Sequence, residues 1–130
     1  MLHYSASHQR PTYLRLCRQP LQEIHSEGYQ FKFGEPDVLT EGKDVAIFTM
    51  GGTVPVLKDC IPILKGKNIN PTIVNVSSLP VKKERIEQIV GEKKCVFVVE
   101  DHFEKGGLTD EIARIMLGMK DKIYFTSRGV

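Results

Sequence analysis

The chain has 130 residues, of which 41% are apolar and 26% charged, so it is long enough and apolar enough for one domain with a packed core. The net charge of +2 is spread along the sequence, which excludes the basic stripe of a nucleic-acid-binding protein. No stretch approaches the roughly 20 apolar residues of a membrane span, and the N-terminus lacks a signal-peptide pattern. We therefore expect a cytoplasmic protein that binds neither nucleic acid nor membrane.

The first 43 residues lack a regular pattern. Residues 1–9 are typical of the tail of a helix, and the alternation over 12–16 predicts a short strand. Residues 19–43 are typical of an extended connector, in which Phe31 and Phe33 alternate with polar neighbours and predict an edge strand.

A regular pattern begins at Asp44. Residues 45–50 form a continuous apolar run, which is typical of a strand buried on both faces of a parallel sheet. Gly51 and Gly52 interrupt the run, and Thr53 suits the N-cap of a helix. That helix places Val54, Leu57, Ile61 and Leu64 on one face, and Pro62 is expected to kink it or end it early.

The same alternation continues to the end of the chain. Strands are predicted at 71–76, 95–99 and 123–126, and helices at 82–90 and 108–117. Strands that alternate with helices at this pace indicate right-handed βαβ units. We therefore predict a three-layer α/β fold, with a mostly parallel five-stranded sheet and helices on both faces. Residues 44–130 would form this domain.

Three cysteines, Cys17, Cys60 and Cys95, match no metal-binding spacing, and their odd number fits buried reduced thiols in a cytosolic protein. Cys95 lies inside a predicted buried strand, which argues against a nucleophile.

Ligands of open α/β sheets bind beyond the carboxyl ends of the strands, where three loops qualify: 51–53, 77–80 and 100–107. The first could hold a phosphate at a helix N-terminus, although it matches neither G-x-G-x-x-G nor a P-loop. A tight turn that needs two glycines is the simpler interpretation.

The loop at 100–107 holds the most titratable groups. Glu100, Asp101 and His102 could do acid–base work or bind a metal. However, consecutive residues that leave a strand point in alternate directions, so Glu100 and Asp101 should not converge on one ligand. The favoured interpretation is a polar loop that packs on another domain or subunit, with Glu100, Asp101, His102, Gly106 and Gly107 as interface residues. We assign no catalytic, cofactor-binding or metal-binding residue.

Several segments, in order, resemble one known family. Residues 100–102 and 106–108 resemble the V-E-E-H-x-x-x-G-G-L segment of the transketolase C-terminal domain, with Asp101 in place of the second glutamate. Residues 39–47 are similar to its L-x-E-G-x-D-V-x-I start, and 51–54 match its G-S-x-V turn less well. Residues 12–19 are similar to Y-I-R-L-x-R, the last strand of the preceding pyrimidine-binding domain. At Ser78–Pro80 the aspartate of the family's I-K-P-L-D stretch is missing.

The resemblance implies a parent enzyme that binds thiamine diphosphate and Mg²⁺ between an N-terminal domain and the pyrimidine-binding domain of a partner subunit. It implies that this domain supports a dimer and binds no cofactor itself. By motif, Arg18 would contact a sugar phosphate, and Arg15 is a weaker candidate. A guanidinium suits that role because it forms forked hydrogen bonds to phosphate, although either side chain could instead be an exposed arginine at a strand end.

The family's metal and diphosphate motif and the catalytic glutamate are missing, and the chain stops at Val130, before a further family helix. We therefore expect a fragment or excised domain that is inactive alone, with 1–18 as the tail of the preceding domain and the remaining transketolase domains or subunit as partner. The alternatives are a stand-alone regulatory or metabolite-binding module, or the same domain of a deoxyxylulose-phosphate synthase or of a 2-oxo acid dehydrogenase β subunit.

Overall fold

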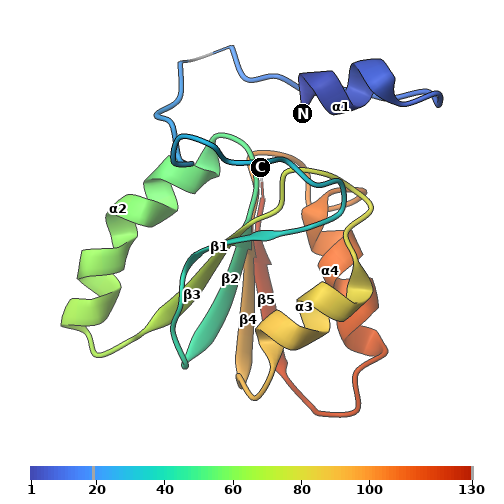
Figure 1. Ribbon diagram of the computed structural model, residues 1–130. Coiled ribbons are helices and arrows are strands. Elements are labelled where there is room, and N and C mark those ends of the chain that lie inside the picture. Colours follow the sequence, from blue (N-terminus) through green and yellow to red (C-terminus); the bar gives the residue numbers. More distant parts are fainter. Residues whose placement is uncertain (19, 130) are drawn as a thin grey trace.

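The continuous apolar runs of the sequence form the middle of a five-stranded sheet. The computed structural model describes residues 1–18 and 20–129 (Figure 1). In chain order the elements are α1 (Leu2–Ser7), β1 (Asp37–Thr40), β2 (Val45–Thr49), α2 (Thr53–Gly66), β3 (Pro71–Asn75), α3 (Lys83–Val90), β4 (Cys95–Val99), α4 (Leu108–Leu117) and β5 (Tyr124–Arg128).

The strand order is β1-β3-β2-β4-β5, with β1 antiparallel to β3 and all other pairs parallel. Parallel neighbours place their carboxyl ends at one edge of the sheet, which is the upper edge in Figure 1. The predicted α/β class and mostly parallel five-stranded sheet are thus confirmed.

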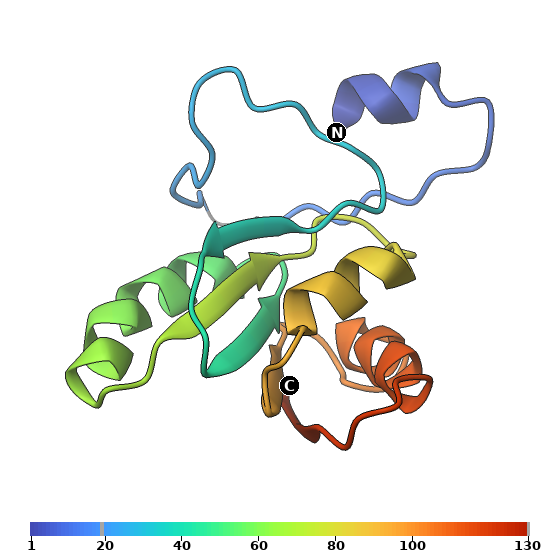
Figure 2. The same cartoon turned by 60° about the horizontal axis from the view of Figure 1, so that its bottom comes forward.

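Helices cover both faces of the sheet, which gives three layers (Figure 2). Alternate residues of β2 explain the arrangement: Ile47 packs with Leu57 of α2, whereas Phe48 packs with the α3 and α4 residues Ile86 and Ile112. Phe48, Ile86 and Ile112 are fully buried. Burial of each such side chain stabilises the fold by about 1.5–3 kcal/mol. The core therefore fixes the positions of the strand ends from which the loops at 51–53, 77–80 and 100–107 begin.

The edge strand was predicted in the wrong place. Phe31 and Phe33 are not in a strand, since their rings pack on Tyr4 with centroids 5.7 and 5.4 Å apart. The edge strand is instead β1, whose Asp37 pairs with Asn75 of β3. The sheet therefore begins inside the segment predicted as connector (19–43).

The strand predicted at 12–16 is also absent, because this segment lies beyond the ends of the sheet strands and has no strand beside it in the described part of the chain. Residues 1–9, predicted as the tail of a helix, contain the short helix α1. Gln19 and Val130, which lie at the predicted segment boundaries, are outside the described residues.

Three local expectations also need correction. Gly52, not Thr53, occupies the N-cap of α2, because the Thr53 hydroxyl instead donates to the Met50 carbonyl at 2.7 Å. The helix does not end at Pro62, which is exposed, but continues to Gly66. The thiols are less buried than expected: Cys17 is exposed, and Cys60 and Cys95 are half-buried.

Candidate functional site

A cavity of about 530 Å³ lies at the carboxyl ends of β2, β3 and β4. We call it the arginine cavity. One wall comes from the sheet and its loops: Met50, Gly51, Gly52, Asn75, Val76, Ser77 and Asp101. The opposite wall comes from the segment before the sheet and includes Arg15, Arg18 and His25. The cavity thus occupies the position where open α/β sheets bind ligands.

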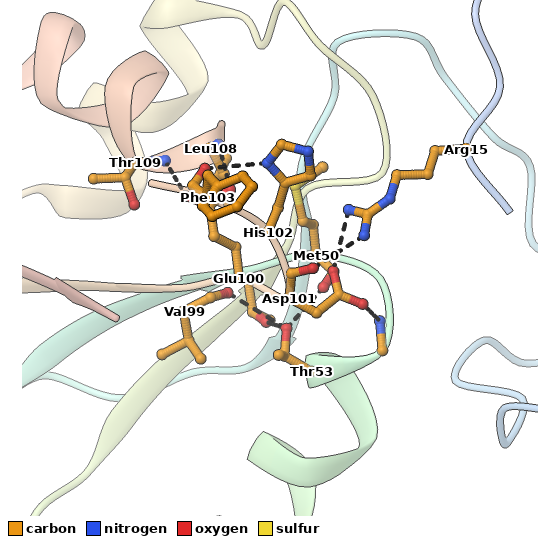
Figure 3. Close-up of polar contacts among 12 residues, drawn as sticks. Arg15, Met50, Thr53, Val99, Glu100, Asp101, His102, Phe103, Leu108 and Thr109 are labelled. Carbon is orange, nitrogen blue, oxygen red and sulfur yellow. Dashed lines mark hydrogen bonds and ion pairs between the residues drawn. The ribbon is translucent and has the colours of Figure 1, made fainter. Parts of the chain in front are cut away.

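Both predicted substrate arginines lie in this cavity. Arg18 is exposed, and its guanidinium has no hydrogen-bond or ion-pair partner within residues 1–18 and 20–129. Arg15 is already engaged, because its Nη1 lies 3.4 Å from the Oδ1 atom of Asp101 and its Nη2 donates to the Asp101 carbonyl at 3.0 Å (Figure 3). Arg18 is therefore the arginine better placed to receive an anionic ligand.

Glu100 and Asp101 diverge, as the alternation of side chains predicts. Glu100 is 2% exposed, and its carboxylate accepts hydrogen bonds at 2.8 Å from the backbone N–H groups of Leu108 and Thr109 (Figure 3). It caps the N-terminus of α4, where a negative charge is favoured. Its side chain faces inward, so the prediction that it contacts a partner is wrong for this residue.

Asp101 occupies the glycine turn that could have held a phosphate. Its Oδ2 accepts a hydrogen bond of 3.2 Å from the backbone N–H of Gly52. A phosphate at this helix N-terminus would meet a carboxylate that the chain itself supplies, and like charges repel. The contact between Asp101 and Gly52 therefore disfavours the phosphate interpretation of 51–53.

The remaining loop residues lie outside the arginine cavity. His102 is exposed, and its Nδ1 lies 3.1 Å from the Phe103 carbonyl. Gly106 has a φ of +78° and donates its N–H to Asp110 at 2.7 Å, while Gly107 is the N-cap of α4. The exposed part of this loop remains a predicted interface, and nothing in its geometry brings two groups together for acid–base chemistry.

A second polar group, which sequence reasoning missed, borders the cavity. The Tyr29 hydroxyl donates to Asp37, with both carboxylate oxygens at 2.8 Å, and Asn75 donates to the same carboxylate at 3.3 Å. The ring of His25 stacks on Tyr29 with centroids 3.6 Å apart, and its Nε2 lies 3.7 Å from Asp37. Asn75 follows the strand-end rule and could have been found, whereas no pattern relates His25 to Asp37.

The Tyr29 hydroxyl should ionise unusually late. Burial, the hydrogen bond to Asp37 and the charge of Asp37 raise the pKa of Tyr29 to about 12. Because this pKa lies above the value of 10 for free tyrosine, Tyr29 stabilises the fold fully below pH 10 and this stability is lost between pH 10 and 12. A rapid pH jump read at 295 nm should show one tyrosine that ionises near pH 12.

Variants identify the tyrosine. Asp37→Asn should lower that midpoint toward 10, since it removes the charge. Tyr13→Phe serves as the control, because Tyr13 is 88% exposed, and it should leave the late step in place. If the late step persists in Tyr29→Phe, another tyrosine accounts for it.

Contacts within the described residues limit where a cofactor or metal could bind. Backbone N–H groups at the N-termini of α2 and α4 are already bonded to Asp101 and Glu100. In residues 1–18 and 20–129 no group of three or more His, Cys, Asp or Glu side chains is arranged to hold a metal ion. Burial raises the pKa of the Cys95 thiol, which disfavours the reactive thiolate. No helix in the described part of the chain is both long and apolar enough to cross a membrane.

Comparisons with known proteins place these features in a wider context. The family model "Transketolase, C-terminal domain" matches residues 34–123. The chain is 33% identical over 131 residues to an apulose-4-phosphate transketolase subunit of Actinobacillus succinogenes, covering 100% of the chain and 42% of that relative. It is also 32% identical over 111 residues to a 1-deoxy-D-xylulose-5-phosphate synthase of Dehalococcoides mccartyi, covering 83% of the chain and 17% of the relative.

The solved structures agree with the sequence matches. A split-gene transketolase, described as an inactive β4 tetramer, superposes with a TM-score of 0.81 at 27% identity, covering 87% of this chain and 37% of that one. The chain thus spans less than half the length of these relatives.

Proposed function

Because this chain belongs to the transketolase C-terminal domain family, we propose that it is the C-terminal part of a transketolase-like enzyme that transfers ketol groups between sugar phosphates. In this proposal the chain carries no catalytic group. It packs against the remaining transketolase domains or subunit, supports a homodimer of the parent enzyme, and contributes Arg18 to the sugar-phosphate site.

The position of Arg18 carries the proposal. Its guanidinium has no partner in the described part of the chain and lines a cavity at the carboxyl ends of three parallel strands. The neighbouring Arg15 is paired with Asp101, whereas Arg18 has no such partner among residues 1–18 and 20–129 and can receive an anionic group. A guanidinium binds phosphate through forked hydrogen bonds. These features favour a ligand that carries a phosphate group.

The relatives support a chain that works with a partner. One relative that matches the whole chain is named as a transketolase subunit, and the split-gene neighbour is described as an inactive β4 tetramer. By analogy, this chain needs another polypeptide or further domains for activity.

Thiamine diphosphate and its Mg²⁺ do not fit the described residues. A diphosphate needs free backbone N–H groups or cationic side chains together with a bound cation. Here the amide of Gly52 and those at the start of α4 bond to carboxylates of the same chain. We therefore assign cofactor binding, and the chemistry that the cofactor supplies, to the partner domains or subunit.

The test is a thiamine-dependent ketol-transfer assay with xylulose 5-phosphate and ribose 5-phosphate. We expect no turnover with this chain alone and turnover when the upstream half is added. Light scattering on the active mixture should give a mass of two copies of each half. A folded, correctly assembled mixture without turnover would contradict the proposal.

A synthase is the second candidate, because the chain is 32% identical to a deoxyxylulose-phosphate synthase over 111 residues. Formation of 1-deoxy-D-xylulose 5-phosphate by the same mixture, without ketol transfer, would favour this candidate. Both reactions use phosphorylated sugars, so the role of Arg18 is common to them.

A further inference from the structure

The segment that carries Arg18 has little structure of its own. Residues 10–18, which we call the arm, form no helix or strand, and Leu14 is their one half-buried residue. In Figure 1 the arm passes over the edge of the sheet at the carboxyl ends of the strands. Something outside the arm must therefore hold it in place if Arg18 is to occupy a defined position in the cavity.

Asp101 makes the polar contacts that hold the arm. Within the described residues, every hydrogen bond or ion pair that joins the arm to the rest of the chain runs from Arg15 to Asp101. Nη1 of Arg15 lies 3.4 Å from Oδ1, and Nη2 donates to the backbone carbonyl at 3.0 Å (Figure 3). The guanidinium thus contacts both the side chain and the backbone of Asp101, and two contacts fix the orientation of the Arg15 side chain more firmly than one.

Asp101 is itself held by the turn at Gly51 and Gly52. Oδ2 of Asp101 accepts the N–H of Gly52 at 3.2 Å. A Cβ atom at Gly51 would lie 3.2 Å, and one at Gly52 3.0 Å, from a carboxylate oxygen of Asp101. The absence of a side chain at both positions therefore makes room for this carboxylate. Asp101 is therefore anchored to the turn between β2 and α2 through one oxygen and binds the arm through the other.

We propose that Asp101 is a positioning residue that sets the place of Arg18, three residues beyond Arg15, and so tunes recognition of the terminal phosphate of the sugar. This inference rests on the proposed function, because it assumes that Arg18 binds that phosphate. In this inference the effect of Asp101 passes through Arg15 and the arm.

The experiment uses the active mixture of this chain with the upstream half. Asp101→Asn keeps the shape of the side chain and removes its charge. The KM for ribose 5-phosphate should rise about threefold to fivefold, as the loss of a half-exposed ion pair predicts, while kcat and the KM for unphosphorylated ribose stay unchanged. Asp110→Asn is the matched control, since Asp110 also accepts a backbone N–H in this loop but does not contact the arm.

A double-mutant cycle separates positioning from a general structural effect. Arg15→Ala removes the contacts to both the carboxylate and the backbone carbonyl of Asp101, so it should raise the same KM at least as much as Asp101→Asn. The double variant should be no worse than Arg15→Ala alone, because the charge pair is already lost in that variant. Independent, additive effects, or an equal rise with unphosphorylated ribose, would overturn the inference.

A second readout does not depend on activity. The mobility of a nitroxide label on Cys17, the exposed thiol of the arm, should increase in Asp101→Asn and not in Asp110→Asn. If the wild-type mixture is inactive, the proposed function fails, and unchanged label mobility would overturn the positioning inference independently. An active wild type with an unchanged Asp101→Asn KM would overturn the inference alone.

Discussion

Replacing Glu100 with alanine is expected to lower the free energy of unfolding by about 3 kcal/mol. The carboxylate is almost fully buried and accepts two backbone N–H groups at the start of α4, each at 2.8 Å. Alanine would leave both donors without their acceptor in a buried place and would remove the charge that complements the helix dipole. An isosteric Glu100→Gln variant should lose less, because one amide oxygen can still accept a hydrogen bond.

Urea denaturation of each variant measures this effect. Glu84→Ala is a matched control, since Glu84 is also a glutamate near a helix N-terminus, in the first turn of α3, but is exposed. Its loss should stay near 0.5 kcal/mol. Similar midpoints for the Glu100 and Glu84 variants, with unchanged slopes, would show that Glu100 is not a structural cap.

The regular half of the fold could be predicted because its physics is local. The apolar runs at Val45–Thr49 and Cys95–Val99 can be buried on both faces only inside a parallel sheet, and helical periodicity located α4 correctly. Side-chain alternation likewise predicted that Glu100 and Asp101 diverge. These conclusions need only neighbouring residues and the geometry of helices and strands.

The first 40 residues could not be predicted in the same way, because their structure depends on distant partners. Phe31 and Phe33 show a strand-like alternation, yet they pack against Tyr4 of α1. The edge position goes to β1, whose Asp37 pairs with Asn75. A strand at an edge is selected by the neighbour that accepts its hydrogen bonds, and single-sequence patterns do not contain that information.

The candidate site was predicted in part for the same reason. The resemblance to the family motif predicted Arg18 and Arg15 as site residues. The rule that ligands bind beyond the carboxyl ends of parallel strands predicted the loops around them. What no pattern contained is the contact between Asp101 and Gly52, which are far apart in the sequence. Because of that contact, the glycine turn binds the carboxylate of Asp101 in place of an anionic ligand.

Arg18→Ala should raise the KM for ribose 5-phosphate about tenfold to a hundredfold in the active mixture, as expected for the loss of charge-assisted hydrogen bonds. The KM for unphosphorylated ribose should change less than about twofold, because that substrate never offers the phosphate. Arg18→Lys should lie between wild type and alanine, since lysine keeps the charge without the forked geometry.

The comparison of ribose 5-phosphate with unphosphorylated ribose distinguishes a lost phosphate contact from unfolding or failed assembly. A variant that merely unfolds or fails to assemble loses kcat with both sugars, whereas a lost phosphate contact acts on one of them. Arg114→Ala is the control, since Arg114 is an exposed arginine in the last turn of α4 and does not line the arginine cavity. If Arg18→Ala leaves the ribose 5-phosphate KM unchanged, Arg18 does not bind the phosphate. The phosphate must then be bound by the partner domains or subunit.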